Sequence, residues 1–216
     1  MIEAQPSGAR ADARVERGRA TRDRLVAAAR QHFGQDGYER TSIAAVLDTA
    51  GVAKGALYHH FASKEGLFDA VLDGVVADIA RSAAAAARAE RDPLGRLRAG
   101  CFAWLELALD PAVQRIALLD APSVVGWTRW REIDEQHTRR GLRASIERLI
   151  VEGRLPPGNS VLYAHMVLAA VNEAALLIAR ADDPQAALAV GKDAVDTLLT
   201  RLAGGSAPPA ATGAGE

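Results

Sequence analysis

The sequence of 216 residues has one cysteine, Cys101, and aromatic residues make up only 5% of it. A single cysteine excludes an intrachain disulfide and is compatible with a reducing compartment. There is no G-x-S-x-G elbow, H-E-x-x-H pair, phosphate-binding glycine loop or dinucleotide fingerprint. One Cys with five scattered His does not supply a zinc site. We therefore expect no enzyme, no metal and no cofactor.

Long apolar runs and alternating apolar and polar stretches are also missing. We expect no membrane-spanning segment, and the Arg and Asp residues near the N-terminus do not form a signal peptide. Without period-two alternation there is no sign of a sheet. Hydrophobic residues make up 49% of the chain, enough for a sizeable core. These features predict a soluble, cytoplasmic, all-α protein.

Helical periodicity and breaking residues predict about nine helices. The expected ranges are 21–35, 41–50, 53–61, 63–90, 93–109, 111–119, 127–152, 160–180 and 184–202. Residues 1–18 and 204–216 are expected to be disordered tails. The chain between them is expected to divide into a domain of three helices at 19–66 and a larger helical domain at 67–203.

The stretch from Thr41 to Lys64 predicts a helix, a tight turn at Gly51 and a second short helix. Thr41 is expected to cap the first helix. In the second helix, Val52, Leu57 and Phe61 are expected to face inward. The outward residues begin with small side chains and continue with polar and aromatic ones: Ala53, Lys54, Gly55, Ala56, Tyr58, His59 and His60. Small residues let a helix enter a DNA major groove, where Lys, Tyr and His supply hydrogen-bond donors.

The segment GVAKGALYHHFASKEGLF, preceded by TSIAAVLDTA and by a helix ending FGQDGY, resembles the DNA-binding domain of the TetR family of transcriptional regulators. The resemblance covers about residues 21–80. One departure is Leu47, four positions before the turn glycine, where many such units carry a small residue. The resemblance implies a helix-turn-helix domain that binds double-stranded operator DNA, joined to a helical domain for ligand binding and dimerisation.

The same resemblance assigns roles to individual residues. Five are expected against base edges: Ala53, Lys54, Gly55, Ala56 and His59. Four are expected against phosphates: Thr41, Tyr58, His60 and Lys64. The distribution of charge agrees modestly with a DNA-binding N-terminal part. Residues 1–64 hold ten basic and seven acidic residues, whereas the remainder holds sixteen basic and twenty acidic residues.

Two further sets lie in the C-terminal half. The candidates for lining an effector pocket are Cys101, Trp104, Leu105, Trp127, Trp130, His137, Tyr163 and Met166. Taken singly, each is better explained as a core or surface residue, and the resemblance is what groups them. The helix at 160–180 is apolar nearly all round, so it needs additional partners. The expected homodimer interface uses Val167, Val171, Leu177, Val195, Leu198 and Leu202.

The main hypothesis is a homodimeric regulator, most simply a repressor released from a palindromic operator by a small hydrophobic effector. Two alternatives remain at this point. One is a small helical enzyme with its pocket among the Trp residues, and the other is an architectural DNA-binding protein without a ligand. Operator binding with and without ligands discriminates among the three.

Overall fold

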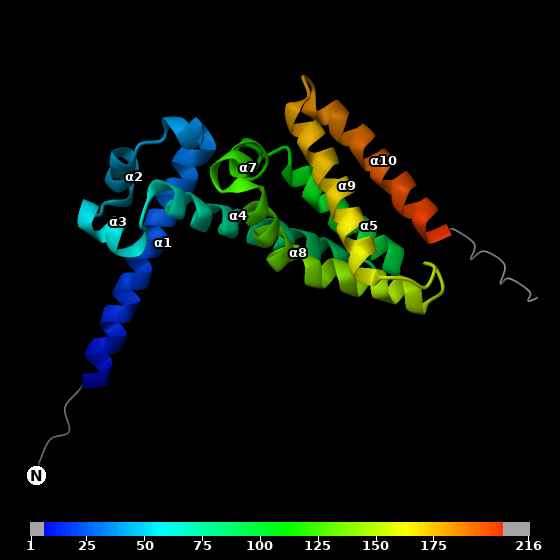
Figure 1. Cartoon of the computed structure of the whole chain (residues 1–216), viewed down its shortest axis with the longest axis horizontal. Helices are drawn as coiled ribbons and strands as arrows, with labels where there is room; N and C mark the ends of the chain where they lie inside the picture. Colours follow the sequence, from blue (N-terminus) through cyan, green and yellow to red (C-terminus); the bar gives the residue numbers. More distant parts are fainter. Residues whose placement is uncertain (1–6, 205–216) are drawn as a thin grey trace, which may run out of the picture.

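The computed structural model describes residues 7–204, and this part of the chain contains helices and no strand. The all-α prediction is confirmed; ten α-helices and one π-helix are present where about nine were expected. Figure 1 shows them in order: α1 (Ser7–Arg40), α2 (Ile43–Ala50), α3 (Lys54–His60), α4 (Lys64–Ala89), α5 (Pro93–Leu107), α6 (Pro111–Val113), η1 (Gln114–Asp120, the π-helix), α7 (Ala121–Val124), α8 (Gly126–Val151), α9 (Ser160–Arg180) and α10 (Pro184–Gly204).

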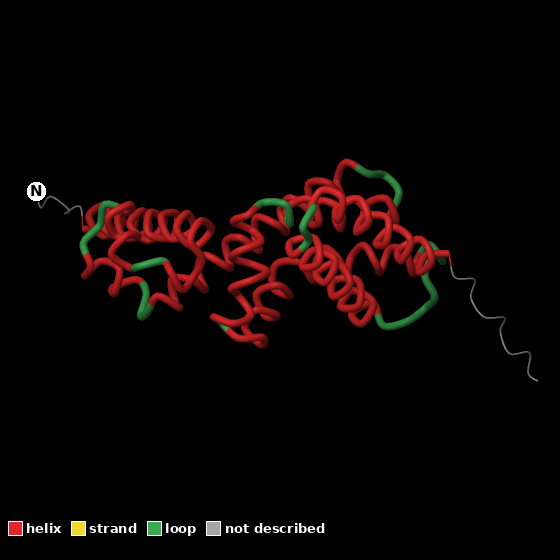
Figure 2. The backbone as a smooth tube through the Cα atoms, turned by 90° about the horizontal axis from the view of Figure 1, so that it is seen from above, coloured by secondary structure: helices red, strands yellow, loops and turns green. Residues whose placement is uncertain are grey.

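The first three helices form one end of the molecule, and α4 runs from that end into the larger helical bundle (Figures 1 and 2). Leu25 and Phe33 of α1, Val46 of α2 and Leu57 of α3 are fully buried in the small core between them. Phe68 of α4 completes this core, with its ring centroid 5.1 Å from that of Phe33 in an edge-on arrangement. Of the residues predicted to face inward from the second short helix, Leu57 and Phe61 are buried, whereas Val52 is half-buried.

The N-terminal segment differs from expectation. Helix α1 begins at Ser7, so residues 7–18 are helical and do not belong to a disordered tail. Gly8 and Gly18 do not interrupt the helix before Thr21, and the lack of an apolar period in this stretch led to the wrong prediction. Residues 1–6 and most of the second expected tail, 205–216, lie outside the described residues.

Gly37 sits at a kink near the end of α1, with φ 81° and ψ 168°. This region of backbone space is open almost exclusively to glycine. The kink turns Tyr38 back so that its ring stacks on Phe33, with 5.8 Å between centroids. It also brings the chain against Arg115, whose guanidinium occupies the space that a Cβ at position 37 would need. Gly37 therefore allows both a backbone bend and a close contact between α1 and η1.

The cap of α2 is one residue later than expected. Ser42 is the N-cap, and its hydroxyl accepts a hydrogen bond from the amide of Ala45 at 3.1 Å. Thr41 is instead buried, with its hydroxyl donating to the carbonyl of Gly37 at 2.8 Å. Gly51 ends α2 in the left-handed conformation, as the predicted turn requires.

The C-terminal bundle is arranged around α4, which packs against α5 on one side and α8 on another. Helices α9 and α10 form a pair at the far side, joined by a short loop (Figure 1). Pro122 does not interrupt the helical path of the chain. It stands in the first turn of α7, where proline needs no amide partner, directly after the π-helical η1.

The prediction that no apolar run is long enough to cross a bilayer is wrong for α9. By length and composition alone this helix could span a membrane. In the structure it packs against α5, α8 and α10, and most of its remaining surface is apolar and uncovered.

We expect Gly37→Ala to lower the free energy of unfolding by roughly 1–3 kcal/mol, because the new Cβ meets the side chain of Arg115 and the backbone is strained. Urea denaturation measures the change. Gly74→Ala is the matched control, since nothing lies near its Cβ within a regular helix. Equal stabilities of Gly37→Ala and wild type would contradict this account of the kink.

Candidate nucleic-acid interface and ligand cavity

Helix α3 presents a polar, exposed face at the end of the molecule opposite α9 and α10 (Figure 1). Ala53, Lys54 and Gly55 are exposed, and a Cβ added at Gly55 would meet open space. Tyr58 is 51% exposed and His59 is also exposed. Ala56 and His60 are half-buried. The structure thus brings the predicted base-reading residues onto one accessible surface.

Three of the four predicted phosphate-contacting residues are buried or half-buried rather than freely exposed. Thr41 is only 3% exposed, so a phosphate cannot reach its hydroxyl without rearrangement; this prediction needs correction, and the exposed neighbour Ser42 takes up the cap. Lys64 is half-buried, with its Nζ donating to the Glu39 carbonyl at 3.3 Å and lying 4.3 Å from the Tyr38 ring centroid. His60 lies beside α1, near Gly18.

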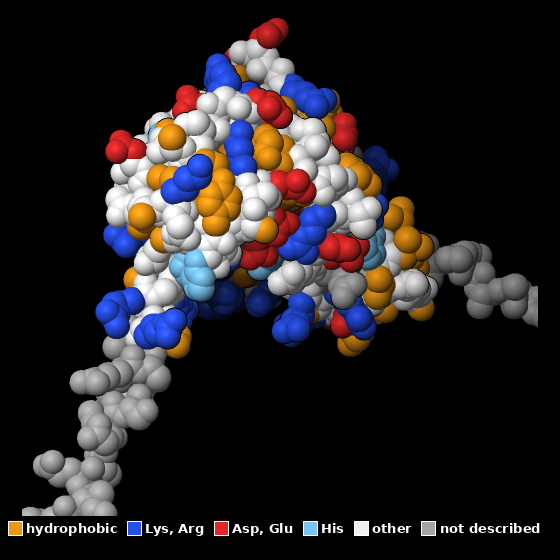
Figure 3. All heavy atoms as spheres, turned by 60° about the vertical axis from the view of Figure 1, so that its left-hand side comes forward, with side chains coloured by type: hydrophobic (Ala, Val, Ile, Leu, Met, Phe, Trp, Pro, Cys, Tyr) orange, Lys and Arg blue, Asp and Glu red, His pale blue; other side chains and the backbone are white. Residues whose placement is uncertain are grey.

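The charge around this face favours an anionic partner. Helix α3 contains no acidic residue, and Lys54 makes no ion pair with the described part of the chain. Arg22 of α1 stacks over Phe61 at 5.3 Å, which places a further cation beside α3. Figure 3 shows basic and histidine side chains gathered at the lower edge of this end. The surface combines donors, small side chains and positive charge, as DNA recognition requires.

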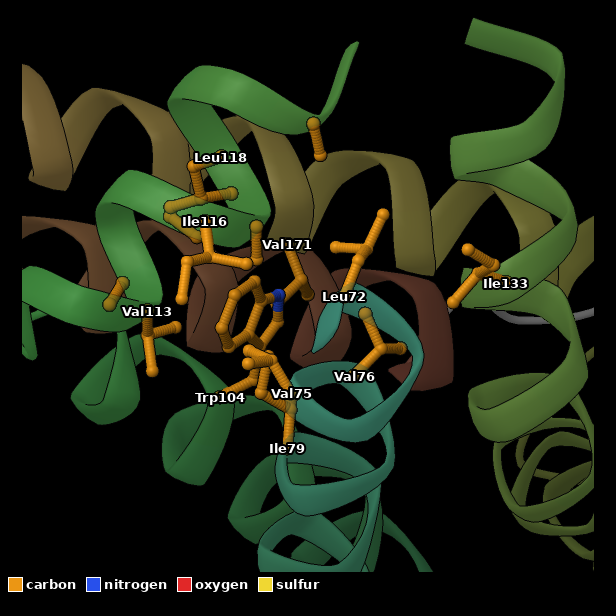
Figure 4. Packing of buried hydrophobic residues seen from close by; sticks show 14 of the residues in the cluster. Leu72, Val75, Val76, Ile79, Trp104, Val113, Ile116, Leu118, Ile133 and Val171 are labelled. Atoms are coloured by element: carbon orange, nitrogen blue, oxygen red, sulfur yellow. The ribbon is translucent and has the colours of Figure 1, made fainter. Parts of the chain in front are cut away.

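A cavity of about 570 Å³ opens within the C-terminal bundle, between α4, α5, α8 and α9, with η1 at one end. One wall consists of small residues of α4: Ala80, Ala83, Ala84 and Ala87. Trp104 of α5 stands at the inner end, packed among apolar side chains from α4, η1 and α9 (Figure 4). The size and the largely apolar lining suit a small-molecule ligand.

Polar groups gather at the inner end in one hydrogen-bonded network. The indole Nε1 of Trp104 donates to Asn172 Oδ1 at 2.8 Å, and Asn172 Nδ2 donates to Asp134 Oδ2 at 2.9 Å. Thr138 donates to the carbonyl of Asp134 at 2.6 Å. Sequence reasoning missed Asp134, Thr138 and Asn172. Asp134 and Thr138 flank His137 on the cavity side of α8, so helical spacing from Trp130 offered a signal. Asn172 stood out only as an amide within an apolar helix.

Burial changes the acidity of two groups in the lining. It raises the pKa of Asp134, although hydrogen bonds from Asn172 and Thr138 act in the opposite direction. Burial also raises the pKa of the Cys101 thiol to about 12, so this thiol stays protonated and unreactive near neutral pH. In the described residues no group of His, Cys, Asp and Glu is arranged to hold a metal ion.

The predicted pocket residues divide into three groups. Cys101, Trp104, Trp130 and His137 line the main cavity, and His137 also lies 2.8 Å from Asp73 Oδ1 of α4. Trp127 lines a second cavity of about 230 Å³, where it packs beside Trp130.

The third group lines neither cavity: Leu105 is fully buried in the core, Tyr163 packs over Gly158 and Met166 is 59% exposed. These three predictions are corrected, because helical periodicity in apolar helices does not show which face meets a cavity.

The predicted interface residues also divide. Val167 and Val171 line the main cavity, and Val195 is buried within the bundle, so none of the three is available to a second subunit. Leu177 and Leu198 are 62% and 44% exposed, and Leu202 is half-buried. The uncovered apolar stripe of α9 and α10 also includes residues that were not predicted or were assigned elsewhere: Leu162, Met166 and Val190.

Two connections join the cavity to the DNA-binding end. The first connection is helix α4, which contributes residues to the cavity and to the DNA-binding end. Arg129 of α8 holds α4 in place by donating hydrogen bonds to both carboxylate oxygens of Asp69, at 2.7 and 3.0 Å. The second connection is η1. Its residues Ala117 and Leu118 line the cavity, while the Asp120 carboxylate at its end accepts from the Tyr38 amide at 2.7 Å.

A helix-turn-helix unit joined by one long helix to a bundle with an internal cavity defines the class of ligand-binding transcriptional regulators. Comparison with known proteins gives the family. Residues 25–71 match the model of bacterial regulatory proteins of the tetR family, and residues 94–202 match the model of the tetracyclin repressor-like C-terminal domain. The chain therefore belongs to the TetR family. Its members are transcriptional regulators, so the enzyme alternative is not favoured.

Individual relatives agree with this assignment. A TetR-family transcriptional regulator from Pectobacterium atrosepticum is 33% identical, with a TM-score of 0.76, and the match covers 87% of this chain and 96% of that one. The regulator TtgR of Pseudomonas putida is 36% identical over 103 residues, which are 47% of this chain and 49% of TtgR. The match thus spans about half the length of such curated relatives. RolR, solved with the ligand resorcinol, shares the fold at 17% identity and a TM-score of 0.67.

We expect Asp134→Asn to change how stability depends on pH. Because burial raises the pKa of Asp134, the folded chain holds this proton more tightly than the unfolded chain. The stabilisation from protonation is complete below about pH 4, the usual value for an unfolded aspartate, and is lost as the pH rises through the folded-state pKa. Wild type should therefore lose stability relative to the variant as the pH rises from about 4 to about 7.

Urea denaturation across that range measures the difference. Asp182→Asn, in the exposed loop after α9, controls for the loss of a carboxylate as such. Parallel curves for wild type and Asp134→Asn would contradict the assigned burial effect.

Proposed function

We propose that this protein is a ligand-responsive, homodimeric repressor that binds a palindromic operator through α3 and leaves it when a small molecule fills the main cavity. The observation that carries the proposal is the continuity of α4. Its first residues pack in the helix-turn-helix core and its alanines line the cavity. Operator DNA lies in the bacterial cytoplasm, which is where such a protein acts.

The docking face is the exposed side of α3. Ala53, Lys54, Gly55, Ala56 and His59 form its base-reading part, with the small residues allowing close approach to the groove. Tyr58 and His60 flank them at the level of the phosphates. Lys64 reaches a phosphate only by leaving the Glu39 carbonyl, and its position in the first turn of α4 adds the favourable helix dipole.

We expect Lys54→Ala to weaken operator binding by roughly 1–3 kcal/mol and to relax the base preference, because Lys54 is exposed and has no competing ion pair. Fluorescence anisotropy with operator and scrambled DNA measures both effects. Lys192→Ala, in α10 at the other end of the molecule, is the matched control. Wild-type affinity and base preference in Lys54→Ala would rule out this docking face.

The dimer is supported by the apolar stripe on α9 and α10, defined by Leu162, Met166, Leu177, Val190 and Leu198, all of which are exposed in a single subunit. Two such helix pairs can pack as a four-helix bundle across a twofold axis. The stripe also explains how α9 can resemble a membrane helix in composition, since its apolar surface serves a second copy. A twofold dimer places its reading helices about one DNA turn, or a multiple of it, apart.

We expect Leu177→Glu and Leu198→Glu each to shift the protein toward monomers, because a charge in an apolar interface lacks a partner. Sedimentation velocity at micromolar concentration measures the change. Val151→Glu is the matched control, since Val151 is 86% exposed on α8 and lies outside the stripe. A monomeric wild type would disprove the proposed interface, and so would dimers of undiminished affinity in both variants.

The switch uses the two connections described above. A ligand at the inner end contacts α4 directly and touches η1 at Ala117 and Leu118. Movement of η1 is passed to the helix-turn-helix core through the bond from Asp120 to the Tyr38 amide. The ligand must favour the DNA-incompetent arrangement, and a coupling of about 1–3 kcal/mol is typical.

The decisive experiment is a shift assay on the DNA upstream of the protein's own gene, with and without candidate ligands. A specific shift that a ligand reverses supports the repressor. Specific binding that no cavity ligand changes supports a DNA-binding protein without an effector. Absence of any sequence-specific binding overturns the proposal.

A further inference from the structure

The outer end of the main cavity differs in chemistry from its inner end. Three arginines line it: Arg88 in the last turn of α4, Arg96 in the first turn of α5 and Arg148 in the last turns of α8. Helices α4 and α8 run in the same direction, as the pairs of Asp69 with Arg129 and of Asp73 with His137 show. That alignment brings the ends of both helices together at this mouth.

Within the described part of the chain, no hydrogen-bond or ion-pair partner is found for these arginines. Of the nearby acidic groups, Asp92 pairs with Arg154 and Glu147 pairs with Arg143, whereas the carboxylate of Glu90 lies beside Gly95. The mouth therefore combines three arginine side chains with an apolar interior.

The only carboxylate in the described lining is at the other end. Asp134 precedes Arg148 by fourteen positions on α8, which corresponds to about 21 Å along the helix. Its oxygens are occupied by the network with Asn172 and Thr138. Along α4 the lining from Val76 to Arg88 spans about 18 Å, which is long enough for an extended chain.

We propose that the effector is an elongated amphipathic anion, with its carboxylate among Arg88, Arg96 and Arg148 and its apolar body along the alanines of α4 toward Trp104. Guanidinium groups bind carboxylates with paired, charge-assisted hydrogen bonds. The length of the lining and its row of alanines suit an extended apolar chain. This inference rests on the proposed function, because it names the class of ligand for the same cavity.

The test compares three probes that share one chain and differ in the head group: dodecanoate, dodecylamine and methyl dodecanoate. Intrinsic Trp fluorescence of the full-length protein, supported by calorimetry, measures binding, since Trp104 stands at the inner end of the cavity. We expect dodecanoate to bind about tenfold or more tightly than either other probe. Equal or tighter binding of the amine would overturn the proposal, and so would failure of all three probes to bind.

The matched variant is the triple change Arg88→Gln, Arg96→Gln and Arg148→Gln, which keeps polar side chains at the mouth but shortens them and removes the charges. It should lose the preference for dodecanoate while binding methyl dodecanoate as wild type does. Arg91→Gln is the control, because Arg91 is exposed next to this mouth and does not line the cavity. An unchanged preference in the triple variant would place the anion elsewhere and reject the site.

A separate readout distinguishes this inference from the proposed function. If dodecanoate binds with the expected preference but does not release operator DNA, the anion site stands and the ligand switch fails. If operator DNA is released by a ligand that competes with neither dodecanoate nor methyl dodecanoate, the proposed switch stands and the proposed ligand class is wrong.

Discussion

One uninterrupted helix supplies apolar side chains to both parts of the molecule, and the remaining structure depends on this constraint. Leu67, Phe68 and Val71 of α4 are buried toward the helix-turn-helix, whereas Val75 and Ile79 are buried around Trp104. A rigid helix of 26 residues cannot satisfy both cores independently. Any change in how the bundle packs on its second half must be absorbed by a tilt of its first half, or by strain in one core.

The junction at Gly37 adds a second constraint of the same kind. The amide of Tyr38 donates to Asp120, and Arg115 covers the glycine, so the end of α1 is held by both ends of η1. A π-helix carries one more residue per turn than its neighbours prefer, and such segments are common at functional sites. Conversion of η1 to a regular helix would rotate Asp120 relative to Ala117. The cavity and the DNA-binding end are therefore joined through two elements.

Local sequence patterns predicted the helix-turn-helix well, because the spacing of apolar residues within each short helix determines which side chains face its core. Spacing alone separated Leu57 and Phe61 from Lys54 and His59, and the structure agrees. The predicted N-cap of α2 was wrong by one residue. Thr41 and Ser42 are chemically alike, and only the kink at Gly37 decides which of them is buried. The helical start at Ser7 was missed because a polar helix lacks a periodic apolar stripe.

The cavity and interface were predicted less well, for a physical reason. Helix α9 is apolar on nearly every side, so periodicity cannot show that Val171 faces the cavity while Leu177 faces outward. The contact between Asp134 and Asn172 joins residues 38 positions apart, which no local pattern reveals. The resemblance to a family supplied the existence of a pocket. It did not supply the lining, which depends on how α4, α5 and α8 meet.

The alanines of α4 explain why a cavity exists at all. Small side chains let α4 approach α5 closely, as the carbonyl of Ala83 shows by lying 3.4 Å from where a Cβ of Gly100 would be. On the opposite side the same small residues leave space before α8, and the structure forgoes the burial that larger side chains would provide. A ligand that fills this space restores those contacts. Because the wall that gains them belongs to α4, the stabilisation acts directly on the helix that also packs in the DNA-binding end, and η1 supplies the second route between the two.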